Sequence, residues 1–204
     1  MFAIQNCPSE KIKDIINNYA NVQNVNINKQ NKDGDTVFML AALYNTDITV
    51  FQCLCNKFKY KIDINQQDND GYTAFMLAAL KNTNEKVIQY LYDSFNDTIN
   101  INKHDKYGNN VFMLAALNNT NVKVLQYLYK ILKNTIDINK LNNYGQTAFM
   151  LATWMNTEVE VLQFLHNTFK NIDINQQDND GNTAFMLAAQ NNTKVEIFQY
   201  LYDT

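Results

Sequence analysis

The chain has 204 residues, of which 46% are hydrophobic and 18% charged, and its formal net charge is −3 at pH 7. All 17 basic residues are lysines, and because arginine is the residue best suited to phosphates and guanine edges, we expect no nucleic-acid partner. No apolar run reaches the roughly 18 residues of a membrane span, and three cysteines form no even disulfide framework, so we expect a cytoplasmic protein without a membrane partner.

The first predicted element is a helix over residues 10–19, in which Ile12, Ile15, Ile16 and Tyr19 recur at helical spacing. We interpret residues 1–33 as an N-terminal capping half-repeat. Residues 34–204 are interpreted as an array of four full repeats and a final partial one, so that the whole chain forms one elongated domain.

The repeat follows from the glycines, which occur in one register at spacings of 37, 37, 37 and 36 residues and nowhere else: Gly34, Gly71, Gly108, Gly145 and Gly181. A fixed period between about 20 and 50 residues indicates stacked units, each burying its apolar face against a neighbour. We expect each glycine to adopt a positive φ in a turn that precedes a helix.

Each glycine is followed by a short apolar segment, such as residues 74–80, which predicts a first helix that only packing can complete. An Asn-Thr pair follows in every unit. It predicts a helix stop at a left-handed Asn and a new start with Thr as N-cap. The last two units add a capping-box pattern, Thr157 with Glu160 and Thr193 with Glu196.

The second helix of each unit carries its apolar residues on one stripe, as Val87, Ile88 and Leu91 show, with Gln89 opposite. A glutamine recurs at this position in every unit, and it either forms a hydrogen-bonded ladder along the stack or faces water. A stretch rich in Asn, Asp and Gln then leads to the next glycine and indicates a turn.

This multi-part pattern resembles the ankyrin repeat. Residues 68–79 keep the Asp, Gly, Thr and Leu-Ala-Ala of the family phrase, and the later Val-Ile-x-x-Leu and Asp-Ile-Asn segments are similar to its second helix and return hairpin. The chain departs from the family where Ala or Val replaces a proline and Asn-Thr replaces Gly-His. The resemblance implies an all-α, ankyrin-like helical repeat solenoid with short hairpin loops, acting as a non-catalytic module that binds another protein.

Catalytic and metal-binding patterns do not assemble in this sequence. Cys53 and Cys55 stand two apart on a predicted helix, about 200° around its axis, and therefore cannot ligate one ion. We interpret both, together with His166, as packing residues, and His104 as a lone turn residue. The acidic turn at residues 68–71 lacks the glutamate that closes a calcium loop. We expect no enzyme activity, no metal and no cofactor.

In the ankyrin family the partner meets the hairpin tips and the first helices on the concave face. Carried onto this chain, these positions gather aromatic residues and a thioether in the central units, which is the composition of an interaction hot spot. The predicted partner-binding residues are Tyr72, Tyr107, Asn109, Tyr144, Gln146, Trp154 and Met155. For Trp154, Tyr107 and Tyr144, packing within the stack remains an alternative.

Two further hypotheses concern the ends and the hairpins. The last helix still carries apolar residues, Phe198, Leu201 and Tyr202, so the C-terminal end is a candidate surface for self-association. The asparagine of each Ile-x-Ile-Asn segment resembles one that is hydroxylated in some ankyrin proteins, although the same side chain ordinarily ties down the hairpin. These asparagines are Asn65, Asn102, Asn139 and Asn175.

Overall fold

The structure, a computed structural model, describes residues 10, 11, 14, 18 and 25–204 of the chain. These residues form pairs of α-helices and a single 3-10 turn at Lys59–Lys61. Most of the predicted helix over residues 10–19 lies outside the described residues. The first helices of the units are α3 (Val37–Tyr44), α5 (Ala74–Lys81), α7 (Val111–Asn118), α9 (Ala148–Met155) and α11 (Ala184–Asn191). The second helices are α4 (Ile48–Phe58), α6 (Glu85–Phe95), α8 (Val122–Leu132), α10 (Val159–Thr168) and α12 (Val195–Asp203).

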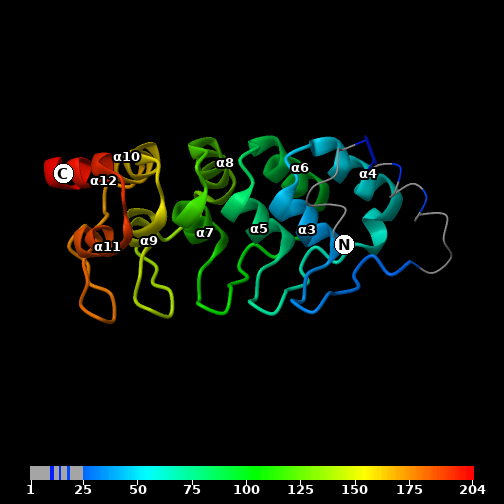
Figure 1. Cartoon of the computed structure of the whole chain (residues 1–204), viewed down its shortest axis with the longest axis horizontal. Helices are drawn as coiled ribbons and strands as arrows, with labels where there is room; N and C mark the ends of the chain where they lie inside the picture. Colours follow the sequence, from blue (N-terminus) through cyan, green and yellow to red (C-terminus); the bar gives the residue numbers. More distant parts are fainter. Residues whose placement is uncertain (1–9, 12–13, 15–17, 19–24) are drawn as a thin grey trace.

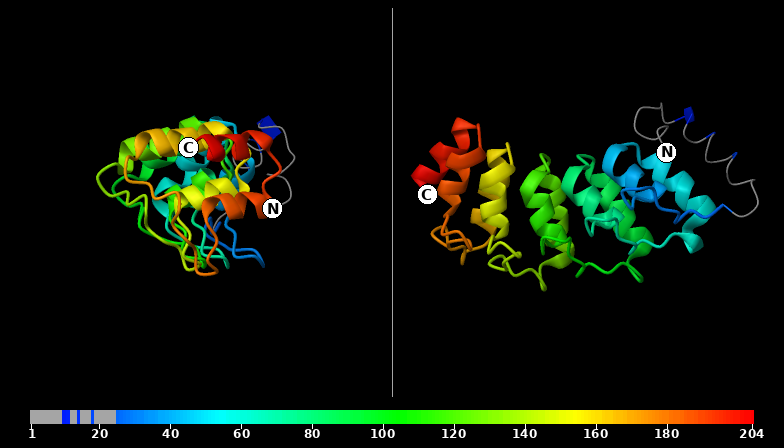
Figure 2. Two further views of the ribbon diagram at one scale, coloured as in Figure 1. Left: turned by 90° about the vertical axis from the view of Figure 1, so that its left-hand side faces the viewer. Right: turned by 60° about the horizontal axis from the view of Figure 1, so that its bottom comes forward.

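The helix pairs stack side by side along the long axis of the molecule (Figure 1). The second helices form one row and the first helices another, while the loops between units extend away from the first helices on the opposite side (Figures 1 and 2). This arrangement confirms the predicted all-α, ankyrin-like solenoid with short hairpin loops.

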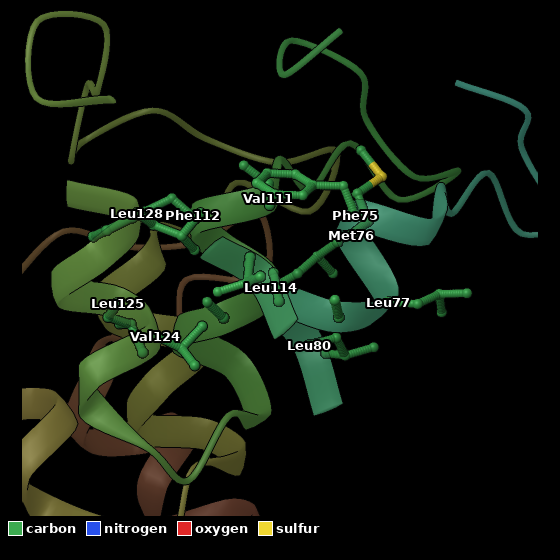
Figure 3. Close-up of a cluster of buried hydrophobic side chains, with 14 of the residues drawn as sticks. Phe75, Met76, Leu77, Leu80, Val111, Phe112, Leu114, Val124, Leu125 and Leu128 are labelled. Carbon is green, nitrogen blue, oxygen red and sulfur yellow. The ribbon is translucent and has the colours of Figure 1, made fainter. Parts of the chain in front are cut away.

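The first helices form the core of the stack. Phe75 and Met76 of α5 and Phe112 of α7 belong to one continuous apolar cluster (Figure 3), and all three side chains are almost fully buried. An isolated helix of 8 residues would be marginal in water, so burial between two neighbours is what stabilises it. The predicted apolar stripe of the second helix is also confirmed, because Val87 and Leu91 are fully buried.

One residue that the repeat predicts to be buried in the core is exposed. The repeat places a phenylalanine column, the second residue of every first helix, and predicts a core residue in each unit; the column is buried at Phe38, Phe75, Phe112 and Phe149. Phe185, however, is 47% exposed. The reason is that within the described chain α11 has a neighbouring first helix, α9, on one side only.

The starts of the second helices also differ from the prediction. The N-cap is the residue after the Thr of each Asn-Thr pair: Asp47, Asn84, Asn121, Glu158 and Lys194. Glu158 and Lys194 make no side-chain capping bond, so the two predicted capping boxes are wrong. Threonine instead caps the first helices α3, α5, α9 and α11, as Thr73 does by accepting a hydrogen bond from the backbone N–H of Met76, and Asn110 caps α7.

The Asn of each pair is extended rather than left-handed, with φ −113° at Asn45 and −79° at Asn82. Its side chain has another task, because Asn82 Nδ2 donates to the carbonyl oxygens of Asn45 at 2.8 Å and Ala42 at 3.1 Å in the preceding unit. Asn119, Asn156 and Asn192 repeat this pair of bonds. Contact between units therefore overrides the local preference of Asn for a left-handed helix end.

The hairpins are tied in the same way. Asn65 Nδ2 donates to Thr98 O, and Asn65 Oδ1 accepts from Asn100 N, both at 2.7 Å. The tying role expected for the asparagine of the Ile-x-Ile-Asn segment is thus confirmed at Asn65, and Asn139 likewise donates to Asn171 O at 3.0 Å. Most of the glutamine column on the second helices is exposed to water, and Gln199 bonds to Asp203 of its own helix.

The glycines perform the predicted turn, with φ between 75° and 86°. At Gly71 the next unit also approaches closely, because Lys106 N donates to Asp70 O at 2.8 Å and would lie 2.9 Å from an added Cβ. Glycine is thus required there by both conformation and space.

Candidate functional site

A groove of about 540 Å³ opens among the hairpins and first helices of the central and last units. All seven residues that the sequence singled out line it: Tyr72, Tyr107, Asn109, Tyr144, Gln146, Trp154 and Met155. The stack brings these residues together although they span more than two full repeats. They form aromatic walls and a polar floor.

The aromatic rim begins at the hairpin tips. Tyr107 and Tyr144 stand at the same register in adjacent units, and their ring centroids lie 6.0 Å apart with an interplanar angle of 32°. Each tip is shaped by a residue two positions earlier, since Asp105 Oδ1 and Asn142 Oδ1 accept from the backbone N–H groups of Tyr107 and Tyr144 at 2.9 Å. The repeated turn therefore orients both rings in the same way.

The opposite wall comes from the end of α9. Trp154 is half-buried, packs in part against the hydrophobic core, as the packing alternative predicts, and also lines the groove. Met155 is 40% exposed, and its sulfur accepts a hydrogen bond from Asn191 Nδ2 at 3.1 Å. Rigid helix packing thus holds an indole and a thioether beside the hairpin tips.

A chain of buried hydrogen bonds forms the polar floor. Asn109 Nδ2 donates to Asp105 Oδ2 at 2.9 Å, and Asn109 Oδ1 accepts from Asn142 Nδ2 at 2.9 Å. Asn142 Nδ2 also reaches Gln146 Oε1 at 3.3 Å. Burial and the nearby carboxylate of Asp105 raise the pKa of the Tyr72 hydroxyl well above its usual range, so it remains a protonated donor.

The chain of bonds stops at the junction of the fourth and fifth units. Asp178 occupies the register of Asn142 there. Asn142 donates to Asn109 of the preceding unit, but a carboxylate has no N–H group and cannot make the equivalent bond to Gln146. Asp178 Oδ2 receives one long bond of 3.4 Å, from Asn182 Nδ2. Within the described part of the chain, Gln146 Nε2 makes no hydrogen bond, although Gln146 is only 8% exposed. A donor and an acceptor are therefore left open to the groove.

The last unit adds groove residues that the predicted site omitted: Asp178, Asp180, Asn182, Leu187 and Gln190. They occupy the registers of Asn142, Tyr144, Gln146, Leu151 and Trp154 one unit further on. The register was the signal that could have found them. The described residues that line the groove include the carboxylates of Asp178 and Asp180 and no lysine, so the groove is electronegative.

The residues considered for metal or nucleophilic chemistry lie elsewhere. Cys55 is buried, and burial raises the pKa of its thiol. His166 Nδ1 lies 3.0 Å from the Tyr200 hydroxyl, and His104 Nε2 lies 3.1 Å from Lys140 Nζ. The described residues contain no group of three or more His, Cys, Asp or Glu that could hold a metal ion. None of the helices described is both long and apolar enough to cross a membrane.

Sequence comparison covers nearly the whole chain. The family model described as ankyrin repeats (3 copies) matches residues 1–105 and 97–178. A second model, ankyrin repeats (many copies), matches residues 156–201. A search of curated proteins found no match to the chain.

Proposed function

Because the chain belongs to the ankyrin repeat family, whose repeats are generally protein–protein interaction modules and typically non-catalytic, we propose that it binds a partner protein through the groove. The observation that supports this proposal is the convergence of all seven variable hairpin and helix residues on one hollow. Residues that vary between the units are thereby gathered on one surface.

The composition of the groove suits a binding surface. Tyr144 is 52% exposed at the rim, beside the half-buried Tyr107 and Trp154. Aromatic anchors surrounded by polar groups carry a large share of the binding energy in protein interfaces. The helices beneath them are buried on both sides, so the groove exists before the partner arrives, which reduces the entropy lost on binding.

The test compares a variant that lacks aromatic groove residues with a variant that lacks a tyrosine outside the groove. Tyr144→Ala with Trp154→Ala removes groove anchors, while Tyr60→Ala removes a fully exposed tyrosine from the 3-10 turn after α4. The full chain and both variants are used to capture proteins from the native cell, with circular dichroism confirming the fold. We expect partners that are retained by Tyr60→Ala and lost by the groove variant. Equal capture by both variants would exclude the groove as the binding surface.

A second candidate function is self-association through the last unit. Phe185 and Met186 are 47% and 50% exposed, whereas Phe149 and Met150, at the same registers one unit earlier, are each 1% exposed. A further layer packed on α11 would bury this surface. Light scattering across a concentration series tests the idea: we expect association that Met186→Lys abolishes, and a chain that stays monomeric at high concentration would contradict it.

A further inference from the structure

The third hairpin contains an internal example of how this stack holds a cation. Lys106 Nζ pairs with the carboxylate of Asp70 and lies 5.0 Å from the centroid of the Tyr107 ring. Asp70 and Tyr107 occupy the same register in adjacent units. An ammonium group therefore fits between a carboxylate and an aromatic ring that are one repeat apart.

The fourth and fifth hairpins also present a ring and a carboxylate at this register, in the reverse order and without the lysine. Tyr144 and Asp180 continue the register of Asp70 and Tyr107, and both line the groove. The lysine position is held by Asn143 and Asn179, whose side chains donate to backbone carbonyl oxygens of the preceding hairpins at 3.1 and 3.0 Å. Because asparagine carries no charge, neither Asn143 nor Asn179 supplies a cation between the Tyr144 ring and the Asp180 carboxylate.

A second observation concerns two polar residues in the floor of the groove, Asp178 and Gln146. Asp178 is 9% exposed: its Oδ1 accepts from the backbone N–H groups of Asp180 and Asn182 at 3.0 and 2.8 Å, whereas its Oδ2 receives one long hydrogen bond. Gln146 is 8% exposed and lines the same groove; its Oε1 accepts from Asn142 Nδ2, while its Nε2 makes no hydrogen bond to another described residue. The Gln146 amide donor and Asp178 Oδ2 line the open groove, where a ligand can complete their hydrogen bonds.

From these contacts, and on the premise that the groove is the partner-binding surface, we propose that it receives a lysine or arginine side chain from an extended segment of the partner. The cationic group lies between the Tyr144 ring and the carboxylates of Asp178 and Asp180. Gln146 Nε2 donates to a backbone carbonyl oxygen of the same segment. At about 540 Å³ the groove is larger than one side chain and accommodates the flanking backbone as well.

The chain offers a conservative variant and a matched control. Asparagine already occupies the register of Asp178 in two other units, at Asn31 and Asn142, so Asp178→Asn preserves the turn. Asp68→Asn makes the same change at a residue outside the groove, where Asp68 Oδ1 accepts from Asp70 N and Tyr72 N. Trp154 is the only tryptophan and reports binding through its fluorescence.

The first experiment titrates the full chain with N-acetyl-arginine methylamide, with its lysine counterpart, and with the neutral isostere N-acetyl-citrulline methylamide. We expect a saturable change in Trp154 fluorescence with at least one cationic probe, and binding at least about fivefold weaker with citrulline and with Asp178→Asn. Asp68→Asn should bind like the unmodified chain. No saturable change with either cationic probe, equal binding of citrulline, or unchanged binding by Asp178→Asn overturns the proposal.

The second experiment separates this inference from the proposed function. Peptides are selected from a random ten-residue display library on the full chain and are then tested on Tyr144→Ala and Asp178→Asn. Peptides rich in lysine or arginine that lose binding to both variants support the inference. Neutral peptides that bind Asp178→Asn but not Tyr144→Ala overturn the inference and leave the groove as the binding surface. Peptides retained by both variants count against both proposals.

Discussion

Asn156 donates a side-chain hydrogen bond of 3.0 Å to the backbone carbonyl oxygen of Asn119, the residue at the same register one unit earlier. Asn119 makes the same bond, also 3.0 Å long, to Asn82. Both asparagines are almost completely buried. The units are thus joined by a buried polar ladder in addition to their apolar contacts, and this ladder fixes the register between neighbours.

Replacing Asn156 by alanine should lower the free energy of unfolding by about 2–3 kcal/mol, because the buried carbonyl oxygens of Asn119 and Ala116 lose their donor. Urea unfolding followed by circular dichroism measures the change. Asn118→Ala, at a half-buried position at the end of α7, is the control and should stay within about 0.5 kcal/mol of the unmodified chain. Equal effects at the two positions would refute the ladder.

Two glycines allow conformational strain to be separated from steric conflict. Alanine at Gly71 or Gly181 must adopt a φ near +80°, which should cost about 1–2 kcal/mol of unfolding free energy at each site. At Gly71 the added Cβ would also lie 2.9 Å from Lys106 N, whereas at Gly181 the nearest atom is 4.0 Å away. Gly71→Ala should therefore destabilise the chain more in urea unfolding, and a larger loss for Gly181→Ala would contradict the hairpin contact.

The phenylalanine column predicts a gradient of stability along the stack. Phe149→Ala removes a side chain that is 1% exposed and should cost about 3–5 kcal/mol of unfolding free energy. Phe185→Ala removes a side chain that is 47% exposed, and its cost should be less than half as large. Thermal or urea unfolding compares the two variants. Similar losses would mean that a further layer covers Phe185 in solution.

His104 should make the chain less stable in mild acid. Burial and the nearby Lys140 lower the pKa of His104 in the folded state, so the unfolded state binds the proton more tightly. The stabilising effect of the neutral imidazole is present above the unfolded pKa of about 6.5 and is lost as the pH falls through the folded pKa.

Urea unfolding at a series of pH values on either side of the unfolded pKa measures this effect. His104→Gln should lose less stability than the unmodified chain on acidification, and Lys140→Gln should reduce the loss by removing a repelling charge. An identical pH dependence in all three proteins would show that His104 does not contribute.

The sequence predicted those parts of the molecule that depend on local chemistry and on repetition. The register of the glycines, their positive φ and the stripe of Val87, Ile88 and Leu91 were all readable, because a turn or an amphipathic helix follows from neighbouring residues. The variable positions at the hairpin tips were readable too, since the period of the repeat marks the residues that the stack does not require.

The remainder was decided by contacts between units. Asn82 is extended and Thr83 is not an N-cap because the Asn82 side chain bonds to the preceding unit, which no local propensity reports. The exposure of Phe185 depends on what packs beside α11, and Asp178 lines the same groove as Gln146 although 32 residues separate them along the chain. Sequence period thus determined the architecture and the candidate residues, while tertiary stacking alone brought Tyr144, Trp154 and Asp178 around one electronegative groove.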